Sequence, residues 1–305
     1  MRVAIASSSL VSTDAIESLV QWPQVEIVSI ISNPDKSSGR GLKLSENSLA
    51  QWASSKGLNV DKPGSQLELI DSLKRDKIEL LITIAYGHIL SLEVLGIPKY
   101  GCINLHFSIL PKYRGAAPVQ WTLLNGDTNT GVTVFNLDKG MDTGPILRQQ
   151  IIDVDKDDST NSLLKKLSLL SGPLLKESII GIGNGEKGTP QSNAGASLAP
   201  KISKENGRID WSSSASQIYN QYRALFENPG VYTQLSGERV RINKLMKTNQ
   251  LLKGEGDCFL QDARLLVATK DFAIELLSVT PEGRKEMSGI DFYNGLKNKT
   301  GITFA

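Results

Sequence analysis

Short apolar runs alternate with amphipathic segments along the first half of the chain. The runs rich in β-branched residues, which predict strands, lie at 2–6, 25–32, 60–62, 80–85, 101–105, 131–137 and 146–154. The segments with apolar residues at helical spacing, which predict helices, lie at 13–20, 47–56, 65–74 and 161–182. Gly172-Pro173 is expected to kink or divide the last helix. Unbroken apolar strands between helices predict a doubly wound, mostly parallel α/β sheet.

The second half of the chain has a different pattern. Residues 183–206 are dense in Gly, Ser, Asn, Pro and Lys without an apolar period, which predicts a linker that wraps the first domain. A capped helix then carries Ile218, Tyr222 and Leu225 on one face and stops at 228–230. The short strand-like runs that follow predict a small β-barrel of OB-like type.

These patterns divide the chain into an α/β domain at 1–182, the linker at 183–206 and a barrel at 207–305. Two domains also agree with the length of 305 residues, since a domain has roughly 150.

Composition narrows the class of protein. Apolar residues make up 40% and charged residues 22%, which is typical of a soluble globular chain. No run approaches the roughly 20 apolar residues of a membrane span, and the start lacks the pattern of a signal peptide, so we expect a cytoplasmic protein without membrane contact. Cys102 and Cys258 lie far apart and outside any CxxC spacing, which argues against a disulfide scaffold or a zinc site. Nothing indicates a coiled coil or an exposed apolar stripe, so we expect a monomer.

The chain has few histidines that could act as catalytic residues. The chain has only His88 and His106, and His106 stands where the predicted strand 101–105 ends. Asn104 is two residues earlier, so on an extended chain both side chains point to the same side. Ligand and catalytic groups of open α/β sheets gather at such strand ends. The plainer interpretation is that His106 merely ends a strand and Asn104 satisfies a turn.

A carboxylate completes a possible set of catalytic groups. Asp142 lies between Gly140 and Gly144, in a loop that an ordinary turn aspartate would also explain. An amide, an imidazole and a carboxylate, in a chain without a GxSxG nucleophile motif, suit transfer of a small acyl group to an amine. The amide and the imidazolium would stabilise the oxyanion, and the carboxylate would help to remove the proton of the amine.

Two motifs carry a family resemblance. Residues 104–115 (NLHFSILPKYRG) and 138–144 (DKGMDTG) resemble those of the 10-formyltetrahydrofolate-dependent formyltransferases. Further segments bring the chain nearest to the members that act on methionyl-tRNA; they are 33–41, 116–118, 201–204, 209–211 and 277–288. The resemblance spans nearly the whole chain and both predicted domains.

The resemblance implies an activity and a set of site residues. The activity is formyl transfer from 10-formyltetrahydrofolate, as cosubstrate and without a metal, to the α-amino group of methionyl-initiator tRNA, for translation initiation. Asn104, His106 and Asp142 match the catalytic trio of the family. The residues that match its folate and pterin site are Ser108, Ile109, Leu110, Pro111, Tyr86, Gly87, Ile89 and Leu90. His88 then belongs to the pocket wall rather than to the catalytic groups.

The resemblance also points to tRNA contacts. Lys36, Arg40 and Lys43 match an insertion that contacts the acceptor end of tRNA in this family, although such a loop can equally be merely solvated. From residue 201 onward the chain carries a net charge of +3, against −1 for the first 200 residues. Arg239 and Arg241 alternate along one predicted strand, where they could track phosphates or simply face solvent.

One departure and two rival functions remain open. The family usually has a Gly-Thr-Pro-type turn after the first strand, whereas this chain has Ser7-Ser8-Ser9, so the turn is expected to take another shape. The first rival is a formyltransferase acting on an amino sugar nucleotide or on glycinamide ribonucleotide. The second is a noncatalytic nucleic-acid-binding protein that keeps the first domain as a scaffold.

Overall fold

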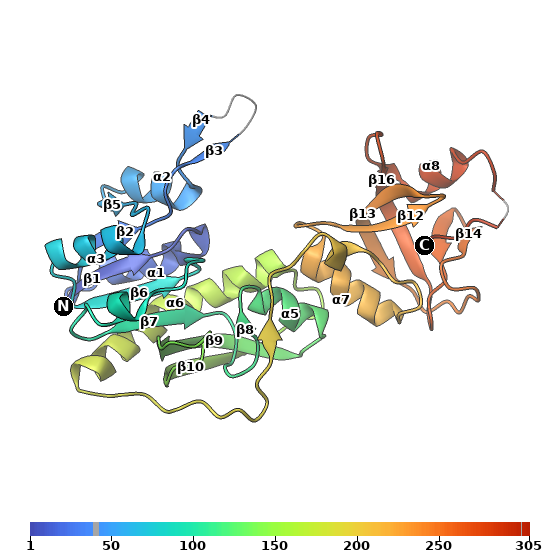
Figure 1. The fold of residues 1–305 in the computed structure, drawn as a ribbon. Helices are drawn as coiled ribbons and strands as arrows, with labels where there is room; N and C mark the ends of the chain where they lie inside the picture. The colour runs from blue at the N-terminus through green and yellow to red at the C-terminus, as the bar shows by residue number, and fades with distance from the viewer. Residues whose placement is uncertain (39–42, 300) are drawn as a thin grey trace. The chain divides into compact units, whose positions relative to one another are not determined.

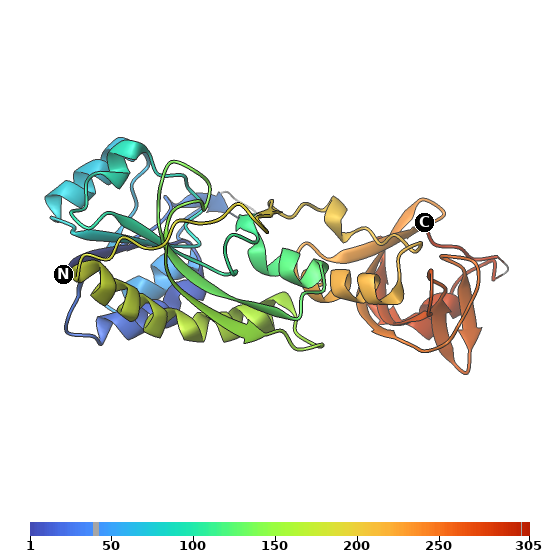
Figure 2. The ribbon, with the colours of Figure 1, turned by 90° about the horizontal axis from the view of Figure 1, so that it is seen from below.

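The structure is a computed structural model that describes residues 1–38, 43–299 and 301–305. It consists of two compact units, drawn in Figures 1 and 2. The first unit comprises residues 1–118, 129–154 and 161–200, and the second comprises 119–128, 155–160 and 201–305. Two short segments that precede residue 161 therefore belong to the second unit.

The first unit is built on one mixed sheet. Its strand order is β10-β9-β7-β6-β1-β2-β5. The bounds are β1 (Arg2–Ala6), β2 (Glu26–Ile31), β5 (Val60–Asp61), β6 (Leu80–Ile84), β7 (Cys102–His106), β9 (Asn129–Asn136) and β10 (Ile146–Asp153). The strands from β5 to β7 run parallel, and β9 is antiparallel to both β7 and β10. The prediction of a mostly parallel α/β sheet is confirmed.

Helices cover both faces of this sheet (Figure 2). Their bounds are η1 (Leu10–Ser12), α1 (Thr13–Val20), α2 (Ser48–Ser55), α3 (Gln66–Arg75), α4 (Leu92–Leu95) and α6 (Thr160–Gly183). On one face, α3 and α4 bury Leu69, Leu73 and Val94 against the strands. On the other face α6 lies against α1, where the Ser168 hydroxyl donates to the Asp14 carboxylate. The sheet is thus buried between two helix layers, as its unbroken apolar strands require.

Helix α6 runs through Gly172-Pro173 without being divided. Pro173 has no backbone N–H, so one helical hydrogen bond is absent. The neighbouring residues Leu174 and Leu175 are buried, and their packing holds the helix in place. Gly172 has a packing role: a Cβ there would lie 2.5 Å from the Cβ of Ser18 on α1. Tertiary packing therefore decides in favour of a single helix.

A hairpin formed by β3 (Lys36–Ser38) and β4 (Lys43–Ser45) projects beyond the sheet (Figure 1). At its base the Lys62 ammonium lies 2.6 Å from both the Asp35 and the Glu46 carboxylates. The cationic insertion of the sequence thus begins and ends on paired strands. Arg40 lies outside the described residues.

The first part of the predicted linker follows the surface of the first unit. Its β11 (Leu198–Ala199) pairs in parallel with β8 (Arg114–Gly115), and Thr189 forms an isolated bridge with Ile146. Gly115 is required by this contact, because a Cβ there would lie 2.7 Å from the Ala199 carbonyl oxygen. Residues 183–200 are accordingly part of the first unit.

The second unit is an antiparallel, barrel-like sheet with flanking helices. Its strand order is β12-β13-β16-β15-β14, and β17 pairs with β16. The strands are β12 (Val231–Leu235), β13 (Glu238–Lys247), β14 (Cys258–Gln261), β15 (Arg264–Val267), β16 (Ile274–Pro281) and β17 (Met287–Ser288). The helices are α5 (Pro118–Leu124, from Val119 onward), η2 (Glu205–Gly207), α7 (Ala215–Leu225) and α8 (Gly289–Asn294). The predicted small β-barrel domain is confirmed in its fold class.

Helix α8 was not among the predicted elements, although the sequence contains its start signal. The Ser288 hydroxyl accepts a hydrogen bond from the Asp291 amide and so caps the helix. The helix is short and follows directly on a strand, which is why its periodicity does not stand out. Within the described part of the chain, no helix is both long enough and apolar enough to cross a membrane.

Candidate active site

The first site residue, Asn104, lies near the carboxyl end of β7. It is in register with Thr83 on the neighbouring parallel strand β6. The Thr83 hydroxyl donates a hydrogen bond of 2.8 Å to Oδ1 of Asn104. Because the amide oxygen is held in this way, the Nδ2 group is the part of the amide that is offered to the cavity beyond the strand end.

His106 ends the same strand and is buried, with 6% of its surface exposed. Its Nε2 atom lies 2.8 Å from the backbone carbonyl oxygen of Tyr113, so Nε2 carries the proton and donates it there. The edge of the ring packs against Phe135. The ring is therefore fixed by a backbone carbonyl, and Nδ1 is directed toward Asp142. Sequence reasoning missed the Tyr113 carbonyl, because every residue has such a group and its direction depends on the fold.

Asp142 approaches His106 from the loop between β9 and β10. Its Oδ2 atom lies 3.7 Å from His106 Nδ1 and accepts a hydrogen bond of 2.7 Å from the Gly115 amide. The residue has φ of 54°, a left-handed conformation that is uncommon outside glycine. Gly144 allows the loop to lie close to β9, since a Cβ there would come within 1.7 Å of the Asn136 carbonyl oxygen.

The three side chains line one cavity of about 530 Å³, a volume within the range of small-molecule sites. Among the predicted pterin-site residues, the cavity is lined by Tyr86, Gly87, Ile89 and Leu90. His88 also lies in the wall, with its ring 5.1 Å from that of Tyr86. Burial, together with the charge of Asp61, raises the pKa of the Tyr86 hydroxyl, so Tyr86 is a neutral wall residue.

The predicted folate turn at Ser108–Pro111 does not line this cavity. Ser108 and Leu110 are buried, and the Ser108 hydroxyl donates to the Lys112 carbonyl oxygen. The Leu110 amide in turn donates to the Thr133 hydroxyl on β9. The turn is therefore hydrogen-bonded to Lys112, which precedes Tyr113 and Gly115, and to β9.

The turn after β1 is closed by serine hydroxyl groups in place of glycine. Ser9 has an extended backbone with φ of −128°, and its side chain caps the 3₁₀ helix η1. The Ser8 hydroxyl donates to the carbonyl oxygen of Ala85, a residue of the cavity wall. This turn thus reaches the edge of the cavity through one hydrogen bond.

The predicted tRNA contacts lie on separate elements. Arg239 and Arg241 are both on β13, and the Arg239 guanidinium lies 3.7 Å above the ring of Tyr232. Arg241 donates a hydrogen bond of 3.1 Å to the Phe226 carbonyl oxygen. Lys36 is the first residue of β3, and Lys43 is the first residue of β4.

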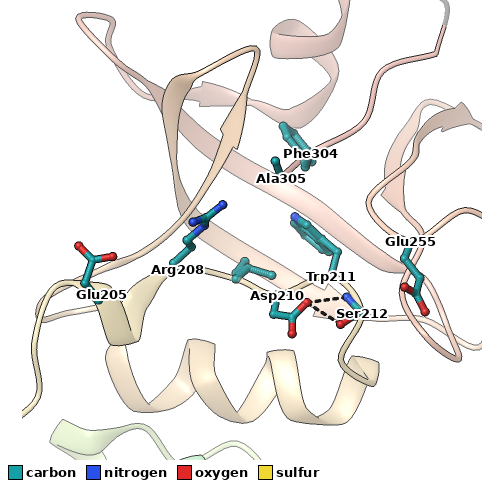
Figure 3. Close-up of a pocket in the computed structure, with 9 residues that line it drawn as sticks. Glu205, Arg208, Asp210, Trp211, Ser212, Glu255, Phe304 and Ala305 are labelled. Atoms are coloured by element: carbon teal, nitrogen blue, oxygen red, sulfur yellow. Dashed lines mark hydrogen bonds between the residues drawn. The ribbon is translucent and has the colours of Figure 1, made fainter.

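The second unit has a cavity of its own, of about 570 Å³ (Figure 3). Asp210 accepts hydrogen bonds from the amide and the hydroxyl of Ser212, and the Trp211 ring stacks on Phe304. Asp210 and Ser212 are thus hydrogen-bonded to each other in the wall of this cavity. Among the described residues, no cluster of three or more His, Cys, Asp or Glu side chains could hold a metal ion.

Comparison with known proteins bears on both units. A family model described as formyl transferase matches residues 1–179, and a model of the formyl transferase C-terminal domain matches residues 201–297. A curated methionyl-tRNA formyltransferase of Caldicellulosiruptor saccharolyticus is 39% identical over 298 residues, which cover 95% of each chain. That of Thermodesulfovibrio yellowstonii is 38% identical over 283 residues, or 91% of this chain and 90% of its own.

A solved structure shares the fold. It is the N-formyltransferase from Helicobacter canadensis in complex with folinic acid and dTDP-3-aminofucose, with a TM-score of 0.67 and 23% identity. The match covers 90% of this chain and 98% of that one. The family models and the curated relatives together span both units, and the chain belongs to the formyl transferase family.

Proposed function

We propose that this protein transfers the formyl group of 10-formyltetrahydrofolate to the α-amino group of methionine esterified to initiator tRNA, for translation initiation. The curated relatives that match nearly its full length are methionyl-tRNA formyltransferases. The single observation that carries the chemistry is the meeting of Asn104, His106 and Asp142 on the wall of one cavity.

The reaction can be followed through these three groups. The neutral amine attacks the formyl carbon, and the carbonyl electron pair moves to oxygen. Asn104 Nδ2 donates a hydrogen bond to this oxyanion, and so does Nδ1 of the protonated His106 ring, because Nε2 is held by the Tyr113 carbonyl. Asp142 takes the proton of the attacking amine. The oxyanion then re-forms the carbonyl, the bond from carbon to N10 of the folate breaks, and N10 leaves with the proton that Asp142 returns. The Tyr113 carbonyl keeps His106 in the orientation that serves the oxyanion.

The apolar part of the cavity suits the ring system of the folate. Its wall includes Leu90, Leu95 and Leu137, and the exposed side chains of Ile89 and Met141 lie at its rim. A cavity of mainly apolar lining with a few converging polar groups is typical of small-molecule sites. The Helicobacter canadensis structure is a complex with folinic acid, which supports a folate as the ligand of this fold.

The tRNA would contact two basic regions. We assign phosphate contacts to Lys36, Arg40 and Lys43 of the insertion and to Arg239 and Arg241 of β13. The stacking of Arg239 on Tyr232 holds a guanidinium in place while its N–H groups remain able to meet a phosphate. In this proposal residues 1–182 catalyse and residues 207–305 bind tRNA. Residues 183–206 connect them, and of these residues 183–200 are part of the first unit.

The two cysteines bear on the compartment of the protein. Cys102 and Cys258 are free, and burial raises the pKa of the Cys102 thiol to about 12. Unpaired thiols suit a reducing compartment, so we assign the enzyme to the cytoplasm, as a monomer. Light scattering on the purified protein should give the mass of one chain, and twice that mass would contradict the monomer.

The activity is tested with purified protein, 10-formyltetrahydrofolate and methionyl-initiator tRNA. Asn104→Ala and His106→Ala should each reduce kcat by about 100- to 1,000-fold, because each removes one donor to the oxyanion. Circular dichroism should show that both variants are folded. Near-complete turnover in either folded variant would contradict the mechanism, and formylation of an amino sugar nucleotide or of glycinamide ribonucleotide in place of methionyl-tRNA would contradict the substrate.

A further inference from the structure

Residues 189–199, which we call the strap, lie within the segment that the sequence presents as a linker. Gln191 of the strap uses its whole side-chain amide. Its Oε1 accepts hydrogen bonds of 3.1 and 2.7 Å from Nε and Nη2 of Arg114. Its Nε2 donates bonds of 2.9 Å to the Asp142 carbonyl oxygen and 2.8 Å to the Gly144 carbonyl oxygen. One side chain thus joins the strap, the Tyr113–Gly115 loop and the Asp142 loop.

The loop that Gln191 holds needs such support. Asp142 has a left-handed backbone with φ of 54°, which surrounding contacts must maintain in a non-glycine residue. Before it in the loop, Lys139, Gly140 and Met141 are exposed, so they contribute little packing. The Gly115 amide fixes the carboxylate, and Gln191 fixes the backbone on both sides of Thr143.

The strap also supports the residue that orients His106. The Tyr113 amide donates a hydrogen bond of 2.9 Å to the Ser197 hydroxyl, and the Arg114 amide donates one of 2.9 Å to the Ser197 carbonyl oxygen. Tyr113 has φ of 63° and presents its carbonyl oxygen to Nε2 of the imidazole. The strap therefore contacts the immediate supports of both His106 and Asp142.

We propose that Gln191 is a positioning residue for formyl transfer, which acts through Asp142 by holding the carboxylate beside His106. This inference rests on the proposed function of the chain. Glutamine is suited to the role because two donors and an acceptor are needed at one position: Nε2 has a hydrogen for each loop carbonyl, and Oε1 meets the two N–H groups of Arg114.

Two replacements separate the hydrogen bonds from the packing. Gln191→Met keeps the length of the side chain and removes all four bonds. Gln191→Glu keeps an acceptor for Arg114 but replaces the donors with an oxygen that faces two carbonyl oxygens. Ser192→Ala is the matched control, since it removes one hydrogen bond of the strap, from the Ala194 amide, without a contact to the site.

The experiment measures kcat and KM for both substrates with the full chain. Because a small displacement of a catalytic group costs up to about 100-fold in rate, Gln191→Met and Gln191→Glu should lower kcat by about 10- to 100-fold. Either KM should change by less than about twofold, because Gln191 does not line the cavity. Ser192→Ala should keep the wild-type kcat, and circular dichroism establishes the folding of each variant.

A double-mutant cycle tests whether Gln191 acts through Asp142. In the Asp142→Asn background, Gln191→Met should have almost no further effect on kcat, since the group that it positions is already lost. Multiplication of the two single effects would overturn the proposal and leave Gln191 with a structural role only. An unchanged kcat in folded Gln191→Met would overturn it as well.

A second readout does not depend on the substrate. The chain has two histidines, so the imidazole resonances of His106 can be assigned in NMR spectra with a His88→Gln variant. Gln191→Met should shift the His106 resonances, whereas Ser192→Ala should not. If wild-type protein fails to formylate methionyl-tRNA, the proposed function is wrong; unmoved His106 resonances in Gln191→Met would overturn the positioning role independently.

Discussion

At the scale of single residues, the direction of one amide decides what Asn104 can do. An asparagine offers a donor from Nδ2 and an acceptor from Oδ1, and only the donor can stabilise an oxyanion. The Thr83 hydroxyl selects between them by donating to Oδ1. Because the two residues are in register on adjacent strands, the sheet itself places the hydroxyl beside the amide.

Replacement of Thr83 by valine should therefore weaken catalysis without creating a cavity in the core. The side chains have almost the same shape, but Thr83→Val frees the amide of Asn104 to turn over. We expect kcat to fall about tenfold, less than the ~100- to 1,000-fold for loss of an oxyanion donor. Thr83→Ser keeps the hydroxyl and should retain most of the activity. If steady-state kinetics gave equal values for the valine and serine variants, the hydroxyl would have no part in orienting Asn104.

At the scale of elements, a carboxylate that is distant in sequence accepts a hydrogen bond from the first turn of α7. Asp271 accepts hydrogen bonds of 2.7 Å from the Ala215 amide, at the first turn of α7, and from the Phe272 amide. The Ala215 amide is the main reason why the pKa of the Asp271 carboxyl lies below its usual range. The negative charge also suits the N-terminus of a helix.

This contact predicts a pH-dependent stability of the second unit. A lowered pKa in the folded state means that the carboxylate stabilises the fold above its unfolded pKa of about 3.9. That contribution is lost as the pH falls through the folded value. Asp271→Asn should accordingly lower Tm at pH 7 and lower it less at pH 3, which is below the unfolded pKa, as measured by circular dichroism. Asp262→Asn, at an exposed turn, is the control and should leave Tm unchanged; an equal loss for Asp271→Asn at both pH values would contradict the electrostatic role.

At the scale of the whole molecule, the net charge differs between the first 200 residues and the residues that follow. The residues from 201 onward carry a net charge of +3 and the first 200 carry −1. The guanidinium groups of Arg239 and Arg241 stand two residues apart on β13, so they lie on the same side of that strand. A basic strand of this kind suits contacts with the phosphates of a duplex stem.

The dependence of tRNA binding on salt measures these contacts. Each neutralised phosphate adds roughly 0.9 to the slope of log affinity against log salt concentration. Arg239→Gln and Arg241→Gln should each reduce the slope for initiator tRNA by about that amount, as measured by filter binding. Lys297→Gln, an exposed cation that follows α8, serves as the control. Unchanged slopes for both arginine variants would remove β13 from the proposed tRNA surface.

The sequence by itself determined the elements and the kind of chemistry. Apolar periodicity is a local property, so it predicted β1 and α1 with their observed bounds and the parallel sheet with them. It also identified an amide, an imidazole and a carboxylate near two motifs. Periodicity did not settle the course of α6 through Pro173, and it left out the short helices α4, α5 and α8.

Only the tertiary structure decided how the site is held and which residues line it. The contacts of Thr83 with Asn104, of the Tyr113 carbonyl with His106 and of Gln191 with the Asp142 loop join residues on different segments. Backbone carbonyl groups and lone hydroxyl or amide side chains have no signature in sequence, because every chain contains many of them. Their function arises from direction and distance, and both are set by the packing of strands, loops and strap around the cavity.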